Sequence, residues 1–409
     1  MTAGGRDPFP APPEPDLTAS ELLARVDVLA ADLIGRQAET EKRTYYAPDT
    51  HEAFARAGMY RVLVPRRYGG YEFGAETFMR VAMTVARACP STGWMYMFGA
   101  AHALAVATLF DGPAQDELLR DGDFICPATV MPSGTARRAP GGWSVSGTWS
   151  YCSGVPYATH FLGHTLVPGA GGEPEPLLFI LTRDQWIRLD DWGGQLGLRG
   201  SGSHSIVVED AFVPDHFTVG THLSQVTVSD ALPGRRWHSN PQYGGGALSF
   251  MLLELGVLAA GMARGALDAY EELLLSRDTL YPPIHPRRED ADYQFRYAEA
   301  TALIDTAEAA ALDAVRQWSD LCADDAAAFT RARELRLALI SREAVRLSWR
   351  AVEGQLFPTA GSSAVREGAR VERVWRDLSM LHSHAGLGVF LSHHANREFT
   401  QEHFGLPVH

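Results

Sequence analysis

Three side chains suited to binding a flat ring lie within residues 91–102. Trp94, Phe98 and His102 follow one another at intervals of four residues, so a helix would place them on one face. Such a face could line an aromatic pocket in which the imidazole accepts a proton or a hydrogen bond. A single histidine on an apolar helix is more often a packed core residue, so core packing stands as the alternative.

A second group combines aromatic rings with a hydroxyl. In Trp149-Ser-Tyr-Cys-Ser153 the residue types alternate, and a strand would place Trp149, Tyr151 and Ser153 on the same face. Rings on that face could stack on a flat heteroaromatic ligand while the hydroxyl bonds to one of its nitrogens. Aromatic residues of strands usually belong to the core, which is the competing interpretation.

Two small-residue segments could meet a phosphate. Gly197-Leu-Arg-Gly-Ser-Gly-Ser203 has glycines that let the backbone approach a ligand, but strand-like residues follow it, so a tight turn is the alternative. Phe357-Pro-Thr-Ala-Gly361-Ser362-Ser363 interrupts two helical patterns, where a plain connection is the alternative. No strand-GxGxxG-helix unit occurs elsewhere, which argues against a nicotinamide site within the chain.

Two histidines, His382 and His384, follow Arg376 and Asp377 at the end of a helical pattern. Their spacing does not match a helical metal pair, and no cysteine or third ligand accompanies them, so we predict no metal site. The spacing alone does not distinguish which of the two histidines faces a ligand.

Composition narrows the class of partner. With 409 residues, 46% of them hydrophobic, and a net charge of -13, the chain can bury a large core and lacks the basic balance that nucleic acid or an anionic membrane would require. A small molecule is the expected partner. Four scattered cysteines and a Pro- and Gly-rich N-terminus without an apolar core segment predict a reduced, cytoplasmic protein.

The texture of the chain predicts a flexible tail and three regions: a tail at 1–16, helices at 17–123, a small β domain at 124–229 and a helical bundle at 230–409. Helical spacing predicts the regions 17–123 and 230–409, while short alternating segments with Gly and Pro turns predict the β domain at 124–229. The most apolar stretch, 247–263, is interrupted by Glu254 and is predicted to be a buried helix. The fold class is therefore mostly α with a central β domain.

Several segments, in this order, resemble the acyl-CoA dehydrogenase superfamily, and within it the flavin-dependent monooxygenases of two-component systems. Known members of that branch act on hydroxyphenylacetate, phenolic steroid intermediates, dibenzothiophene and aminosugars. The similarity runs from about Leu22 to about His403. The segments that carry it are Pro65-Arg-Arg-Tyr-Gly-Gly-Tyr-Glu72, Ser91-Thr-Gly-Trp94, Trp149-Ser-Tyr-Cys-Ser-Gly154, Gly197-Leu-Arg-Gly-Ser-Gly-Ser203, Gly261-Met-Ala-Arg-Gly-Ala-Leu267 and Val374-Trp-Arg-Asp377 with His384.

The resemblance implies an N-terminal helical domain, a small β-barrel or sandwich and a C-terminal four-helix bundle, assembled as a homotetramer. A flavin, FMN or FAD, would lie between the β domain and the bundle. Ser153 would approach the flavin N5, with Trp149 and Tyr151 forming a wall of the ring site. Arg277 and the loop Gly361-Ser362-Ser363 would meet the flavin phosphates, the loop from a neighbouring subunit.

The resemblance also assigns roles to the histidines. His384 would lie beside the reactive flavin carbon and His102 on the substrate side, with Trp94 and Phe98 lining the substrate pocket. His384-Ala-Gly386 stands where dehydrogenases carry their base segment. Relatives often follow this histidine with Asn and Asp, whereas Leu387 and Gly388 follow it here, so the local hydrogen-bond network and the substrate differ.

The implied reaction takes reduced flavin from a separate NAD(P)H:flavin reductase and adds oxygen at the flavin C4a to form a hydroperoxide. Ser153 and His384 would stabilise it, and His102 would act as a general base near its useful pKa towards a phenol or amine. Hydroxylation of an aromatic molecule, for example in natural-product synthesis, is the leading prediction. N-hydroxylation of an amine or aminosugar, an acyl-CoA dehydrogenase or oxidase, and a flavin-free scaffold are the alternatives.

Overall fold

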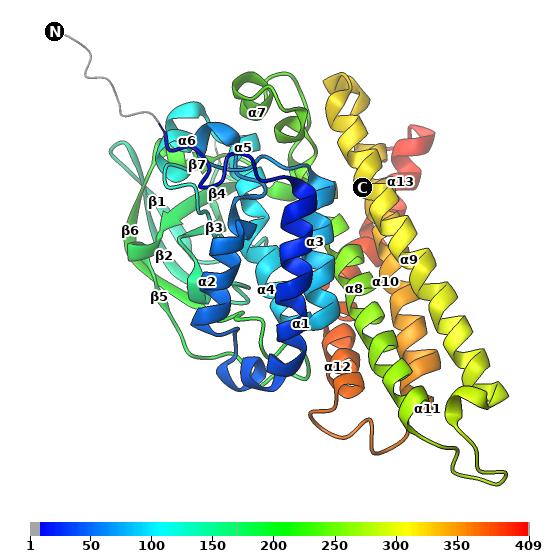
Figure 1. Ribbon diagram of the computed structural model, residues 1–409. Helices are drawn as coiled ribbons and strands as arrows, with labels where there is room; N and C mark the ends of the chain where they lie inside the picture. The colour runs from blue at the N-terminus through cyan, green and yellow to red at the C-terminus, as the bar shows by residue number, and fades with distance from the viewer. Residues whose placement is uncertain (1–8, 170, 408–409) are drawn as a thin grey trace.

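The computed structural model describes residues 9–169 and 171–407. Figure 1 shows a helical region and a β region side by side, with long bundle helices on the far side of the helical region. This arrangement confirms the predicted class, mostly α with a central β domain. Residues 1–8 of the tail predicted for 1–16 lie outside the described residues. Phe9 packs edge-on against Tyr68, with ring centroids 4.8 Å apart.

Amphipathic segments build the N-terminal region. Thr18 caps the first helix through a capping box with Glu21, which satisfies otherwise unpaired backbone N–H groups. The helices of this region are α1 (Ala19–Arg43), α2 (Pro48–Ala57), α3 (Ala75–Ala88), α4 (Pro90–Ala100), α5 (His102–Leu109) and α6 (Gly112–Leu118). Nearly all of α4 is buried, including the candidate residue Trp94, whereas Phe98 is partly exposed.

Two antiparallel sheets form the β region. One has the strand order β1-β2-β6-β5 and the other β3-β4-β7. The strands are β1 (Thr135–Ala139), β2 (Gly142–Trp149), β3 (His160–Pro168), β4 (Pro174–Thr182), β5 (Ile187–Arg188), β6 (Ile206–Pro214) and β7 (Thr218–Val219). Trp149 of the first sheet packs on Phe161 and Phe179 of the second, so its ring joins the two sheets in one core.

Four long or medium helices carry the C-terminal region. After the short α7 (Pro233–Trp237) come α8 (Ala247–Ser276), α9 (Ala291–Ala323), α10 (Arg331–Ala351) and α12 (Arg370–His382), with α11 (Phe357–Ala360) and α13 (Ala395–Phe404) as shorter pieces. Two π-helical segments, 352–356 and 386–394, continue α10 and precede α13. The bundle predicted from Ala- and Leu-rich periodicity is therefore present.

Helix α8 lies at the centre of this bundle. Among the described residues it is the one helix with the length and apolar composition to cross a membrane, and 89% of its most apolar window is buried within the protein. It packs on α3, α9, α10 and α12, so its apolar surface is used inside the fold. The predicted buried helix at 247–263 is confirmed.

Candidate active site

The hydroxyl of Ser153 lies just beyond the end of β2, in a turn completed by the left-handed Gly154. Its Oγ accepts a hydrogen bond from Trp94 Nε1 (3.0 Å) and lies 2.8 Å from Ser203 Oγ. Ser203 is in turn 2.7 Å from Ser201 Oγ. Three hydroxyls and an indole thus form one chain, in which a proton of Ser153 can be directed to a ligand.

Trp94 connects this chain to the other candidate residues. Its ring centroid lies 4.7 Å from that of Phe98 and 5.6 Å from that of His384, the latter edge-on. Trp94 is buried, whereas Phe98 is only partly so. The structure therefore brings together Trp94, Phe98, Ser153 and His384, which come from three separate parts of the chain.

His384 follows the end of α12. Its Nδ1 accepts a hydrogen bond from the Gly386 N–H (3.2 Å), which places the proton of a neutral imidazole on Nε2. Surrounding protein atoms lower the pKa of His384, although part of its ring reaches solvent. His384 is thus a neutral N–H donor beside the Ser153 chain. His382 points elsewhere and stacks on Trp349, with centroids 5.3 Å apart.

His102 begins α5 and is buried. Its Nδ1 donates to the Cys126 carbonyl (2.8 Å) and approaches the Phe98 carbonyl (3.1 Å), so Nε2 carries the lone pair. Burial lowers the pKa of His102 to about 4. The expectation of a general base near its useful pKa is therefore wrong for the unliganded protein: desolvation makes His102 a hydrogen-bond acceptor before it is a proton acceptor.

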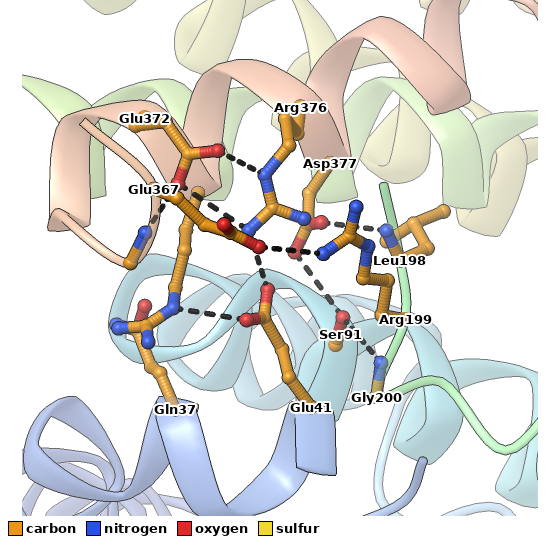
Figure 2. Close-up of polar contacts among 12 residues, drawn as sticks. Gln37, Glu41, Ser91, Leu198, Arg199, Gly200, Glu367, Glu372, Arg376 and Asp377 are labelled. Carbon is orange, nitrogen blue, oxygen red and sulfur yellow. Dashed lines mark hydrogen bonds and ion pairs between the residues drawn. The ribbon is translucent and has the colours of Figure 1, made fainter. Parts of the chain in front are cut away.

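The glycine-rich loop 197–203 carries Ser203 and is fastened to α12 by Asp377 (Figure 2). One oxygen of Asp377 accepts the Leu198 N–H (2.6 Å) and the other accepts the Ser91 hydroxyl (3.2 Å). Ser91 Oγ also accepts the Gly200 N–H (3.2 Å). Burial raises the pKa of Asp377 to about 7. One carboxyl therefore holds the loop, and with it Ser203.

Arg376 completes the attachment. It pairs with Glu41 of α1 (2.7 Å) and with Glu372 of its own helix, and it donates to the Leu196 carbonyl (3.0 Å). A Cβ on Gly197 would meet the Arg376 carbonyl oxygen at 2.1 Å. Glycine is required at that position because helix and loop backbones touch. The loop is thus a turn fixed between α1, α4 and α12, and no helix follows it.

The predicted common face of Trp149, Tyr151 and Ser153 is wrong. The strand ends at Trp149, and Tyr151 adopts a left-handed conformation with φ of 61°, so the alternation stops. Trp149 is fully buried, and its Nε1 donates to the His164 carbonyl (3.0 Å). It therefore has no surface to offer a flavin. Tyr151 is 63% exposed, with its ring edge-on to Trp192 at 5.4 Å.

The residues predicted to bind the flavin phosphates lie close to one another, but at a different place from Ser153. Arg277 Nη1 donates to Ser363 Oγ (2.8 Å), next to Gly361 and Ser362 in the loop after α11. Figure 1 places α11 at the end of the bundle away from the β region. Within one chain these residues are thus separate from Ser153, and their role towards a flavin of a neighbouring subunit stays a prediction.

Ser203 is a residue whose contact the sequence did not reveal. It lay in the glycine-rich segment proposed for a phosphate, and its partner Ser153 is fifty residues away. The signal was the row of small hydroxyl residues among glycines, which allows close approach but does not name the partner.

The geometry accommodates the edge of a flavin ring. The Ser153 hydroxyl and the Nε2–H of His384 suit ring nitrogen and oxygen acceptors, and Tyr151, two residues before Ser153, has an exposed ring. No group of three or more metal-ligating side chains occurs among residues 9–169 and 171–407.

Comparisons with known proteins agree with the fold. Residues 19–113 match the N-terminal domain of acyl-CoA dehydrogenase and residues 253–388 its C-terminal domain. The oxygenase subunit HsaA, a flavin-dependent monooxygenase of Rhodococcus jostii, is 30% identical over 94% of this chain and 99% of its own length. The oxygenase component of an FADH2-dependent resorcinol hydroxylase from Rhizobium is 28% identical over 93% of each chain.

Among solved structures, the 3-HSA hydroxylase from Rhodococcus sp. RHA1 superimposes with a TM-score of 0.85, at 27% identity, over 95% of this chain and 98% of that one. The similarity thus covers the helical, β and bundle regions together. The chain belongs to the acyl-CoA dehydrogenase family, in its branch of flavin-dependent monooxygenases.

Proposed function

We propose that this monooxygenase hydroxylates an aromatic small molecule, using reduced FAD or FMN and O2. The observation that carries the proposal is the meeting of Ser153, Trp94 and His384 around one accessible position. Relatives named for action on aromatics, such as the resorcinol hydroxylase, support the substrate class. Bound reduced flavin would supply the electrons that activate oxygen.

Ser153 and His384 are the donors of the site. Trp94 donates to Ser153 Oγ, so Ser153 can turn its proton towards a flavin nitrogen when Ser203 is the donor of the hydrogen bond that the two hydroxyls share. His384 holds its proton on Nε2, directed by the Gly386 N–H at Nδ1. Fixed donors of this kind stabilise negative charge as it develops, without the reorganisation that water would need. Both residues would thereby favour transfer of oxygen to substrate over loss as hydrogen peroxide.

His102 would orient the substrate. Its Nε2 can accept a hydrogen bond from a phenol O–H or an amine N–H, which increases electron density on the ring or nitrogen to be oxidised. Because its pKa is about 4, it stays neutral and keeps that lone pair across the physiological range. N-hydroxylation of an amine would use the same contact. Testing phenols and amines as substrates in the stopped-flow experiment below distinguishes the two reactions.

The proposal includes a separate NAD(P)H:flavin reductase, because the chain has no strand-GxGxxG-helix unit to hold a nicotinamide. It also includes a homotetramer in the cytoplasm. Four cysteines without disulfide partners, all buried, are compatible with a reducing compartment. Light scattering after gel filtration would test the assembly, and a dimer or monomer would contradict it.

The deciding experiment mixes the protein with anaerobically reduced FMN or FAD, adds oxygen and follows flavin absorbance by stopped flow. We expect a delay before the oxidised spectrum returns, and with an accepted phenol or amine we expect hydroxylated product. If the oxidised spectrum returns as fast as it does for flavin without protein, the proposal is contradicted. Bleaching of oxidised flavin by an acyl-CoA would instead indicate a dehydrogenase.

A further inference from the structure

One acidic side chain lies in the most apolar part of the protein. Glu254 is on α8, is 1% exposed, and its carboxyl has no hydrogen-bond partner or ion pair among the described residues. An unpaired carboxyl in such surroundings destabilises the fold, because burial removes its hydrogen bonds to water without replacing them. Desolvation raises the pKa of Glu254 well above its ordinary value, because burial in apolar surroundings favours the protonated, uncharged carboxyl.

The carboxyl borders a small cavity together with His102. The cavity has a volume of about 20 Å³, and most of its lining is apolar, including Leu104, Phe250 and Trp318. His102 and Glu254 are the titratable side chains of this lining. The two groups come from α5 and α8, which belong to different domains of the fold. A polar pair thus faces one apolar space at the junction of those domains.

The hydrogen-bonding capacities of the pair are complementary to one kind of ligand group. His102 Nε2 offers a lone pair, because Nδ1 donates to backbone carbonyls. A neutral Glu254 offers one O–H donor and a carbonyl acceptor. A hydroxyl can donate to the imidazole and accept from the carboxyl at the same time, whereas a methyl group can do neither. The site is therefore chemically specific for a hydroxyl.

We propose that Glu254 is a substrate-binding residue which, together with His102, holds a phenolic hydroxyl of the aromatic substrate. The inference rests on the proposed function and adds to it the identity of the second polar contact. The unpaired carboxyl is the group that the substrate hydroxyl would satisfy, which gives a physical reason for keeping an acid in an apolar helix.

The size of the cavity limits which part of the substrate can occupy it. A volume of about 20 Å³ holds roughly one water-sized group, so it matches a hydroxyl but not an aromatic ring. Met251 is the flexible, partly exposed side chain of the lining. Its unbranched thioether can change rotamer at small cost to make room for the ring.

The test compares binding of phenol and of toluene, which differ by hydroxyl against methyl. Titration calorimetry is carried out on the full chain, wild type and Glu254→Leu. We expect the wild type to prefer phenol, and Glu254→Leu to lower phenol affinity by about tenfold or more while toluene binds as well or better. Glu254→Gln keeps a donor and an acceptor and should retain most of the preference.

Glu334→Gln is the matched control. Glu334 is also buried, but its carboxyl accepts a hydrogen bond from Ser249 Oγ (2.9 Å), so the change affects the fold and not the proposed ligand. We expect its phenol-to-toluene ratio to equal that of the wild type. Removal of an unpaired carboxyl should raise the melting temperature of Glu254→Leu, which would also show that this variant folds.

Two results would overturn the inference. One is a wild type that does not distinguish phenol from toluene, whether both bind or neither does. The other is an equal preference in Glu254→Leu and wild type. Flavin reoxidation without substrate is measured in parallel and should be delayed equally in both proteins. If reoxidation is not delayed in either protein, the proposed function is contradicted. A changed phenol-to-toluene ratio in Glu254→Leu would still support the contact at Glu254.

Discussion

Ser153, His384 and His102 have different hydrogen-bonding roles that follow from their neighbours. His384 is a donor at Nε2 because the Gly386 N–H fills its Nδ1, and Ser153, which accepts from Trp94, can donate to a ligand when Ser203 donates to it. His102 is an acceptor because backbone carbonyls hold its Nδ1 proton. At the scale of single residues, donors and acceptor are thus divided between the proposed flavin side and the substrate side.

Replacing Ser153 or His384 by Ala should lower the yield of hydroxylated product per reduced flavin consumed by about tenfold or more, because a fixed donor is lost. Flavin affinity should change less. Product by chromatography and hydrogen peroxide by a peroxidase assay check this. His382→Ala is the control, since His382 stacks on Trp349. Unchanged yields in both Ser153 and His384 variants would refute their assignment.

Trp149 gives a second test at the residue scale. Trp149→Phe removes the indole hydrogen bond to the His164 carbonyl, which still accepts the Ser133 N–H (3.0 Å), so unfolding free energy should fall by only about 1 kcal/mol. Flavin affinity should remain as in the wild type, because the ring is between the sheets. Urea denaturation and flavin titration measure the two quantities. A loss of flavin affinity with unchanged stability would restore Trp149 to the flavin site.

At the scale of elements, α12 positions the loop 197–203. Asp377 and Arg376 attach the loop to α1 and α4 as well, so three helices determine where Ser203 meets Ser153. The site therefore depends on contacts among elements that are far apart in the sequence, and damage to the attachment should affect chemistry at a distance.

Asp377→Ala removes the acceptor of the Leu198 N–H, so we expect a lower melting temperature and a lower product yield. Asp377→Asn keeps an acceptor and should retain both. The pKa of Asp377 is raised from 3.8 to about 7, so the folded protein keeps a proton that the unfolded chain releases. This contribution to stability is present below about pH 4 and is lost as pH rises towards 7.

Asp377→Asn lacks this titration. Its unfolding free energy relative to wild type should therefore increase between about pH 5 and pH 8, by at most about 4 kcal/mol across the full range. Denaturation curves of both proteins at the two pH values measure the difference. A constant difference would show that Asp377 is ionised in the folded protein at both pH values.

At the scale of the whole molecule, the separation of Arg277 and Ser363 from Ser153 is the main feature. A flavin that touched all of them would extend between subunits, as the proposed tetramer allows. Exposed apolar side chains occur in the loop after α8 and near the start of α9, namely Leu280, Tyr281 and Phe295. Burial between subunits would account for them.

Arg277→Ala should weaken flavin binding by about tenfold, because a cation facing phosphate is lost. Mixed assemblies test whether it acts across subunits. Unfolding and refolding Arg277→Ala together with Ser153→Ala would regenerate intact sites in about a quarter of random pairings if each site uses Ser153 of one subunit and Arg277 of another. Product yield above that of either variant alone is expected. No recovery in a confirmed mixed assembly would place both residues in one subunit's site.

Local pattern alone was sufficient for the class of fold. Helical spacing, strand alternation and Gly and Pro turns are properties of neighbouring residues, so the helical region, the hairpin ending at Pro168 and Pro174, and the bundle were predictable. The contact between Trp94 and Phe98 was likewise predictable, because four residues make about one helical turn, whereas α4 ends at Ala100 and His102 begins the next helix. The resemblance carried by ordered motifs extended this to the family.

Only the tertiary structure decided how distant residues meet and what they do there. It separated His384 from His382, placed Trp149 in the core between the two sheets, joined Ser153 to Ser203, and brought Glu254 and His102 into the lining of one cavity. It also lowered the pKa of His102 to about 4, which no spacing could reveal. Burial and hydrogen-bond partners belong to the packed chain, and they are what turn residue types into donors, acceptors and neutral acids.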